Sequence, residues 1–210
     1  MTGRPEANHQ VIAPWGYGDN FDLQQLSSFA PRLFELANRL CLQQSVSAAS
    51  KTHIEDLRDI TINYRYGGMF RLDPHIDPLA DGGHVFIVGL KSDVVLTLTP
   101  DLNQLESILS SSEDGKQKSA SKLKIRTAEE AVALRSWTDE DIDILLRRGS
   151  LLHLRGPARY EWKHAIRTGV VVEAETQDGD RRPVICDWLG DINTLIPRQQ
   201  DRVSVIFAFK

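Results

Sequence analysis

The stretch Asp73-Pro74-His75-Ile76-Asp77 is followed by two apolar runs, at 85–90 and 94–98. An Asp-Pro pair favours a turn, and short apolar runs bounded by turn residues are typical of buried strands. Side chains two positions apart on an extended backbone point to the same side. We therefore predict a β-rich fold in which His75 and Asp77 present a nitrogen and an oxygen ligand to one point.

A second stretch, Gly156-Pro157-Ala158-Arg159-Tyr160-Glu161-Trp162-Lys163-His164, ends in a histidine among aromatic and basic residues. Two histidines and one carboxylate, with the opposite face of the metal left open, are the ligand set of non-haem Fe(II) sites. We therefore predict that one divalent metal binds to His75, Asp77 and His164.

Two other histidines are rival ligands by residue type. His84 follows the turn Asp81-Gly82-Gly83, but no carboxylate lies two residues away from it. His153 lies in an alternating segment upstream of His164 and lacks the matching local context. For these reasons we prefer His164 as the third ligand.

The size and composition of the chain suit one globular domain. Its 210 residues are 41% hydrophobic and 26% charged, and strand-rich folds reach this length as single units. The formal net charge of −4 argues against strong non-specific binding to nucleic acid, which needs a basic surface. Residues 1–10 lack the apolar region of a secretory signal, and no run approaches the length of a membrane span. With only two cysteines, Cys41 and Cys186, we expect a reducing compartment, cytoplasmic or nuclear.

Residues 1–20 are predicted to form a tail and an aromatic strap, and residues 21–210 a single domain. The rings of the strap, Pro14-Trp15-Gly16-Tyr17-Gly18, either cover an edge of the core or form a lid over a substrate, and burial is the commoner fate of such rings. From Pro31 an amphipathic helix is predicted, capped by Ser27 or Ser28. Its apolar residues recur at spacings of three and four: Leu33, Leu36, Ala37, Leu40 and Cys41.

Alternating residues predict further strands at 59–66, 141–146, 150–154, 170–174 and 202–210. One face of the strand at 94–99 is expected to be partly solvated. Residues 175–201 are expected to form a long polar connection, in which Cys186-Asp187-Trp188 could begin an extra strand. The serine- and lysine-rich residues near 101–126 are expected to form a flexible insert. Alternation gives each of two predicted strands one face that bears candidate site residues. On the strand at 59–66 this face carries Ile60, Ile62, Tyr64 and Tyr66, and on the strand at 202–210 it carries Arg202, Ser204, Ile206, Ala208 and Lys210.

Together these features resemble the AlkB-like family of Fe(II)- and 2-oxoglutarate-dependent dioxygenases. The resemblance covers roughly residues 58 to 210 apart from two inserts, and its pieces occur in the family's order. They are Asn63-Tyr64-Arg65-Tyr66-Gly67-Gly68, Asp73-Pro74-His75-Ile76-Asp77, residues 156–166 and Arg202-Val203-Ser204-Val205-Ile206-Phe207. The resemblance implies a double-stranded β-helix, or jelly roll, in a β-rich α+β fold with the N-terminal helix packed on the outside.

The resemblance also implies two cofactors, Fe(II) and 2-oxoglutarate. The iron would hold the keto acid end of 2-oxoglutarate, and the planar guanidinium of Arg202 would pair with its far carboxylate. Tyr64 or Tyr66 would donate a hydrogen bond to the cofactor, and Ser204 lies on the same face of its strand as Arg202. The implied reaction converts 2-oxoglutarate and O₂ into succinate and CO₂ while it oxidises a substrate C–H bond, so that an N-methyl group leaves as formaldehyde.

The chain departs from the family pattern at one position. The family usually has a second arginine six residues after the first, and this chain has Ala208 there. Lys210, two residues further along the same face, could substitute for it. This departure supports an alternative reading, in which the chain is a catalytically weak or inactive relative that acts as a binding module.

The resemblance implies a methylated nucleic acid, RNA or DNA, or a methylated protein as the substrate. The lack of a run long enough to span a membrane leads us to expect no membrane partner. The insert near 101–126 carries several lysines, which either form a solvated loop or contact nucleic acid. The acidic net charge makes a protein with methylated lysine or arginine an electrostatically sensible substrate as well.

Overall fold

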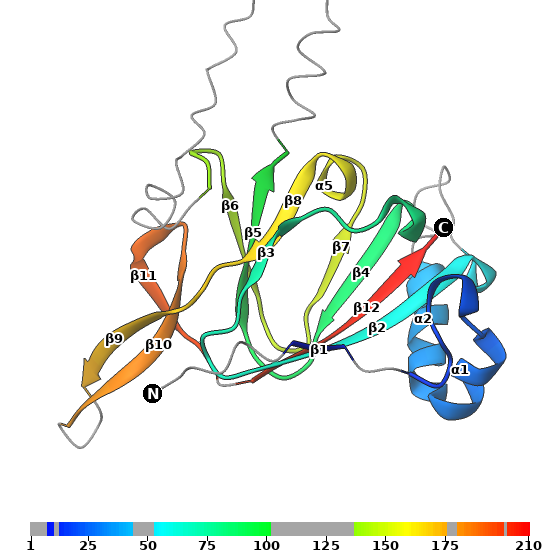
Figure 1. Ribbon diagram of the computed structural model, residues 1–210, viewed down its shortest axis with the longest axis horizontal. Helices are drawn as coiled ribbons and strands as arrows, with labels where there is room; N and C mark the ends of the chain where they lie inside the picture. Colours follow the sequence, from blue (N-terminus) through cyan, green and yellow to red (C-terminus); the bar gives the residue numbers. More distant parts are fainter. Residues whose placement is uncertain (1–7, 11–12, 44–52, 102–136, 176–179, 200) are drawn as a thin grey trace, which may run out of the picture.

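Two antiparallel sheets form the body of the computed structural model, which describes residues 8–10, 13–43, 53–101, 137–175, 180–199 and 201–210. A five-stranded sheet has the order β1-β2-β12-β4-β7, and a four-stranded sheet has the order β3-β8-β5-β6 (Figure 1). The first sheet consists of β1 (Asn8–Gln10), β2 (Leu57–Tyr66), β12 (Asp201–Phe209), β4 (His84–Gly89) and β7 (Leu151–Leu154). The second consists of β3 (Leu72–His75), β8 (Trp162–Ile166), β5 (Val94–Pro100) and β6 (Ile142–Leu146).

The inner faces of the two sheets share one buried core. Ile87 of β4, Leu96 of β5 and Ile166 of β8 belong to the same hydrophobic cluster, which therefore joins the five-stranded sheet to the four-stranded sheet. Two sheets that bury their alternating apolar residues against each other are compatible with a β-sandwich. The prediction of a β-rich fold with few helices is confirmed.

Two helices pack on the outer face of the five-stranded sheet (Figure 1). These are α1 (Leu23–Phe29) and α2 (Pro31–Gln43), and Ala37 and Leu40 of α2 are buried in a cluster with residues of β2, β4 and β12. The predicted helix from Pro31 is therefore confirmed. The predicted cap is wrong, because Ser27 and Ser28 lie inside α1, whose own cap is the Asp22 carboxylate.

The aromatic strap divides between two environments. Trp15 is 6% exposed and belongs to the hydrophobic cluster between the helices and the five-stranded sheet, which we call the outer core. Its indole N–H donates to the carbonyl oxygen of Ile60 over 3.3 Å. Tyr17 is 61% exposed. The first ring covers the core, as expected for a strap, and the second stays at the surface.

A third sheet replaces the polar connection predicted for residues 175–201. Its order is β11-β10-β9, formed by β9 (Val170–Glu175), β10 (Arg181–Leu189) and β11 (Asp191–Pro197). The polar composition misled the prediction, because Arg181, Arg182 and Pro183 are exposed residues at the start of a strand. A small core of Val170, Cys186 and Trp188 stabilises this sheet.

A second correction concerns the burial of β5. All seven residues of β5 are buried, although Thr97 and Thr99 suggested a partly solvated face. The carboxylate of Asp187 in β10 accepts a hydrogen bond from the Val95 amide, and Asp143 accepts one from the Thr97 hydroxyl. These polar partners make burial of the threonine face possible.

The remaining short elements lie in the connections. They are α5 (Pro157–Tyr160) and three 3₁₀ turns, η1 (Gly18–Asn20), η3 (Ile54–Asp56) and η4 (Leu79–Asp81). The pair Asp73-Pro74, predicted as a turn, lies inside β3, an edge strand with an irregular register, where proline is tolerated. The insert expected near 101–126 lies outside the described residues except for Asp101.

No helix among the described residues is both long and apolar enough to cross a membrane.

Candidate metal centre and adjoining pocket

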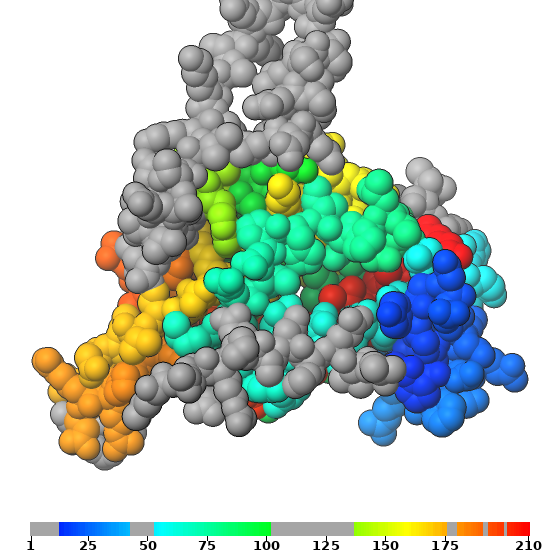
Figure 2. All heavy atoms as spheres, viewed as in Figure 1, coloured from blue at the N-terminus to red at the C-terminus, as the bar shows by residue number. Residues whose placement is uncertain are grey.

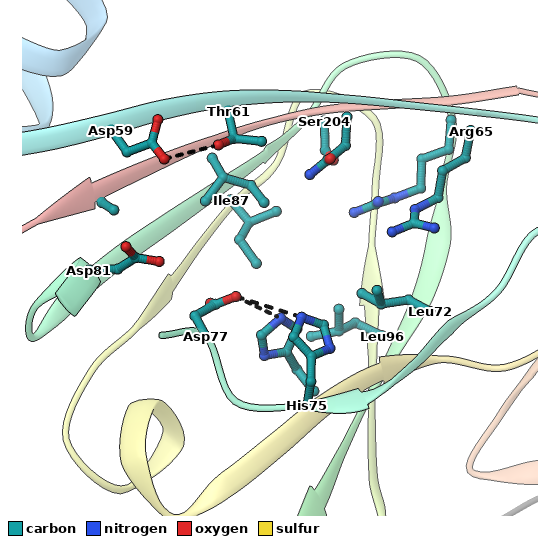
Figure 3. Close-up of a pocket in the computed structure, with 15 residues that line it drawn as sticks. Asp59, Thr61, Arg65, Leu72, His75, Asp77, Asp81, Ile87, Leu96 and Ser204 are labelled. Carbon is teal, nitrogen blue, oxygen red and sulfur yellow. Dashed lines mark hydrogen bonds and ion pairs between the residues drawn. The ribbon is translucent and has the colours of Figure 1, made fainter. Parts of the chain in front are cut away.

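The three predicted metal ligands converge at one end of β3. His75 is the last residue of β3 and lies directly opposite His164 of β8 in the strand register, and Asp77 follows two residues later. The Nε2 atoms of His75 and His164 are 3.6 Å and 3.7 Å from Oδ1 of Asp77 (Figure 3). One ligand atom from each residue lies within 4.8 Å of the others, so the group could hold a metal ion.

The charge states of His164 and Asp77 suit a divalent cation. Burial lowers the pKa of His164 to about 4, so its imidazole is neutral and has a lone pair to donate. The pKa of His75 is raised, first by its interaction with the Asp77 side chain. Burial works against ionisation of Asp77, yet the two histidines hold the pKa of its carboxyl below the usual value. Its Oδ2 is buried without a hydrogen bond among the described residues, so Asp77 keeps an unused electron-pair donor.

Arg159 fixes the segment that carries Asp77. Its guanidinium is 2% exposed and donates to the carbonyl oxygens of Asp77, Pro78 and Gly82, over 2.9, 2.6 and 3.0 Å. Arg159 lies in the downstream stretch that was used to find His164, but its positioning role was not predicted. A buried arginine that joins α5 to the segment after β3 has no sequence signal beyond its place in that stretch.

The rival histidines lie elsewhere. Nδ1 of His84 is 3.0 Å from Nε2 of His153, and the His153 ring stacks on Phe86 with centroids 4.0 Å apart. Phe86 belongs to the outer cluster that packs under the helices. The structure therefore brings neither His84 nor His153 to His75.

A cavity of about 210 Å³ opens beside the metal ligands, between the two sheets. Figure 2 shows the surface hollowed between the cyan-green segment near residue 75 and the blue helices, with the red of β12 visible inside. Every second residue of β2 and of β12 lines this cavity: Asp59, Thr61, Asn63 and Arg65 on the first, and Arg202, Ser204, Ile206 and Ala208 on the second. The predicted face of β12 is thus the face that meets the cavity.

One end of the cavity is cationic. Arg202 is 5% exposed, and among the described residues we find no hydrogen-bond acceptor or ion-pair partner for its guanidinium. Burial, then the nearby charges of Arg65 and Arg198, lower its pKa to about 10. A buried, unpaired guanidinium is costly, so this end of the cavity is suited to an anionic group.

The other end of the cavity is acidic (Figure 3). Asp59 and Asp81 line it, and the buried Oδ1 of Asp59 has no hydrogen bond among the described residues. Both residues and Thr61 also line a wider outer groove of about 700 Å³, which reaches Tyr17 of the strap. The cavity therefore has a cationic end, a candidate metal group and an acidic mouth.

Three predicted cofactor contacts need correction. Tyr64 and Tyr66 lie on the face of β2 opposite the cavity, and the Tyr64 hydroxyl donates to Asp201 over 3.0 Å. Lys210 is exposed and does not line the cavity. The residues that β2 does present, Asn63 and Arg65, stood beside the two tyrosines in the quoted motif but were not considered, because the choice of face was wrong by one residue.

No family model matches the chain, and no curated protein is significantly similar to it.

Proposed function

We propose that this chain is an AlkB-like Fe(II)- and 2-oxoglutarate-dependent dioxygenase that demethylates N-methyl groups. One observation carries the proposal: Arg202, which is buried and has no partner in the described part of the chain, lines the same cavity as the group of His75, Asp77 and His164. A ligand with a metal-binding keto acid at one end and a carboxylate at the other end, such as 2-oxoglutarate, fits that arrangement.

The residues fit an iron centre in their chemistry. Two imidazoles and a carboxylate are the donor set that Fe(II) prefers, and the buried Oδ2 of Asp77 has no competing protein donor among the described residues. When bound, the iron with 2-oxoglutarate and O₂ would supply the oxidising power that converts an N-methyl group into an N-hydroxymethyl group. Such a product would release formaldehyde, and 2-oxoglutarate would leave as succinate and CO₂. The chain's share is to orient both ligands and to exclude water from the cavity.

We further propose that the two sheets form a double-stranded β-helix. Apart from β1 and the third sheet, eight strands remain, and they follow one another as β2, β3, β4, β5, β6, β7, β8 and β12. Their orders, β2-β12-β4-β7 and β3-β8-β5-β6, mean that the chain crosses repeatedly from one sheet to the other. This is the strand arrangement expected of an eight-stranded jelly roll.

The acidic mouth supports a substrate that carries a positive charge. Asp59 and Asp81 lie where the outer groove meets the cavity, and the groove adds Asp19 against a single cation, Arg58, which forms ion pairs with Asp19 and Asp81. A methylated amine of a protein or a nucleic acid meets this requirement. The charge of the groove favours a polypeptide with a methylated lysine or arginine over a phosphate backbone.

The first experiment measures succinate release. We expect the full chain to convert 2-oxoglutarate to succinate with Fe(II), ascorbate and O₂, and Asp77→Ala to abolish this turnover. His84→Ala is the matched control, and it should behave like the parent chain. Formaldehyde release from a methyl-lysine peptide, compared with methylated single-stranded RNA and DNA at several salt concentrations, then separates the substrates.

The alternative function, a binding module, predicts another result. It is favoured by Ala208, which stands where relatives carry a second cation. A chain that binds metal and 2-oxoglutarate but releases no succinate with any methylated substrate would support this alternative and contradict the proposed enzyme.

A further inference from the structure

Two buried arginines face each other across neighbouring strands at the cationic end of the cavity. Arg65 of β2 is the direct register partner of Arg202 of β12, and both line the cavity (Figure 3 shows Arg65). They are 7% and 5% exposed. Like charges placed directly opposite each other across strands are destabilising, so an anion bound between the two guanidinium groups would relieve their repulsion.

The other buried arginines of the chain show what a structural role looks like. Arg198 donates to the carbonyl oxygens of Gly68, Phe70 and Arg167 and pairs with the Asp187 carboxylate. All four of these partners of Arg198 are groups of the protein itself. Arg202 has no such partner among the described residues.

Arg159 and Arg167 follow the same structural pattern. Arg159 donates to three carbonyl oxygens, and Arg167 pairs with Asp143 over 2.6 Å and with Asp141 over 3.6 Å. Arg65 donates from one terminal nitrogen to the carbonyl oxygen of Arg71, over 2.9 Å, which holds its guanidinium in place while it lines the cavity. Arg65 and Arg202 thus stand apart, since they line the cavity together.

We propose that Arg65 and Arg202 form a cross-strand clamp for the far carboxylate of a dicarboxylate ligand. The inference rests on the proposed function and adds to it a second cofactor-binding residue, Arg65, which supplies the positive charge that Ala208 cannot. Each guanidinium offers a planar fork of donors, so two of them can satisfy both oxygens of one carboxylate. The hydroxyl of Ser204, fully buried and without a partner among the described residues, is a further donor on this wall.

The clamp has a consequence for selectivity. Because an ionised carboxylate would interact favourably with both guanidinium groups, 2-oxoglutarate should bind far better than 2-oxobutanoate, which shares the keto acid end and lacks the far carboxylate. A merely structural Arg65, acting through the Arg71 carbonyl, would affect both ligands alike.

The test is calorimetric binding to the full chain with Mn(II) under anaerobic conditions. We expect Arg65→Met to weaken 2-oxoglutarate binding roughly 10- to 100-fold, because charge-assisted hydrogen bonds to the far carboxylate are lost. The affinities for 2-oxobutanoate and for Mn(II) should stay within about twofold of the parent values. Arg65→Lys, which keeps the charge without the planar fork, should lie between Arg65→Met and the parent chain. Arg39→Met, which removes an exposed positive charge on α2, is the control and should change nothing.

Each result has one meaning. Equal 2-oxoglutarate affinity in the parent chain and in Arg65→Met, or an equal loss for both ligands, overturns the clamp and leaves the proposed function standing. A parent chain that binds Mn(II) and no 2-oxoglutarate overturns the proposed function together with the clamp. If Arg65→Met does not fold, Arg65→Lys decides, because an unchanged preference for 2-oxoglutarate in that variant contradicts the need for a planar fork.

Discussion

His75 and His164 are direct register partners in the pairing of β3 with β8, and their rings lie 4.2 Å apart between centroids. Neighbouring strands of one sheet thus bring together two residues that are far apart in the sequence. Asp77, just beyond the end of β3, completes the group from a segment that Arg159 holds. The geometry of the candidate metal group is therefore set by the pairing of two strands.

The first prediction concerns the identity of the ligands. Removing His164 should weaken metal binding more than about 100-fold, since the loss of a direct ligand should exceed the 10- to 100-fold typical of outer-shell changes. His153→Ala is the matched control, because His153 lies on the outer face with His84. Titration with Co(II), followed by its absorption spectrum, measures both. Comparable losses in the two variants would refute the assignment.

The second prediction concerns Arg159. Arg159→Met should lower the free energy of unfolding by about 3 kcal/mol, because three carbonyl oxygens lose their donor. It should also weaken metal binding, since the backbone next to Asp77 is released. Urea unfolding and metal titration measure the two effects, with the exposed Arg155→Met as control. A variant that loses stability but keeps full metal affinity would show that Arg159 does not position Asp77.

The third prediction is that the effect of Arg202→Met on the free energy of unfolding changes sign when ligand is added. In the absence of ligand, Arg202→Met should raise the free energy of unfolding by roughly 1 to 3 kcal/mol, because a buried charge is replaced by an apolar side chain. In the presence of Mn(II) and saturating 2-oxoglutarate, the parent chain should become the more stable of the two, since ligand binds only to its folded form. Urea unfolding with and without ligand tests both statements. A destabilised ligand-free variant would mean that Arg202 has a protein partner after all.

The fourth prediction concerns pH. Burial raises the pKa of Asp59 to about 6, against the hydrogen bond from Thr61. Between about pH 4, where an unfolded aspartate ionises, and pH 6, the folded chain keeps a proton that the unfolded chain loses, so stability falls as pH rises through this window.

Asp59→Asn should remove that fall in stability. At pH 8 its free energy of unfolding should exceed that of the parent by about 1 kcal/mol, less than the full pKa shift would give because the group is partly solvated. Urea unfolding at pH 5 and pH 8 provides the comparison, and the exposed Asp139→Asn is the control. If the free energy of unfolding changes equally with pH in the parent and in Asp59→Asn, the raised pKa of Asp59 is contradicted.

The fifth prediction separates the two rings of the strap. Trp15→Ala should cost about 3 kcal/mol of stability, because a buried indole leaves a cavity in the outer core. Tyr17→Ala should change stability by less than about 0.5 kcal/mol, as is usual for exposed residues. Thermal unfolding of both variants is sufficient. If Tyr17→Ala is as damaging as Trp15→Ala, the exposed ring has a packing role that the structure does not show.

Alternation and local motifs predict much of this fold from the sequence. The spacing of Leu36, Ala37 and Leu40 identifies α2, and the alternation of residues 202–210 identifies β12 and its cavity face. Of the polar strand β10, only the segment Cys186-Asp187-Trp188 was considered as an extra strand, because the residues at its start, Arg181, Arg182 and Pro183, are exposed and show no apolar alternation.

The face of β2 could not be predicted for a different reason. One face of β2 packs against the helices, and the other faces the second sheet. The face toward the helices carries the apolar Ile60, whereas the face toward the second sheet carries the polar Asn63. Strand alternation states which residues share a face but not which face meets a cavity. The tyrosines were therefore assigned to the wrong side, and Arg65 was passed over.

The cavity lies between the two sheets, and this location has a consequence for ligand length. Arg202 belongs to the five-stranded sheet and His164 to the four-stranded sheet, while the apolar residues Ile87 and Leu96 line the same cavity. The separation between the anion-binding end and the metal group therefore depends on how thickly the core between the sheets is packed. Changing the size of one core side chain should therefore change the preferred length of the dicarboxylate ligand, although no charged residue is altered. Hydrophobic packing would then determine which ligand length the cavity accepts.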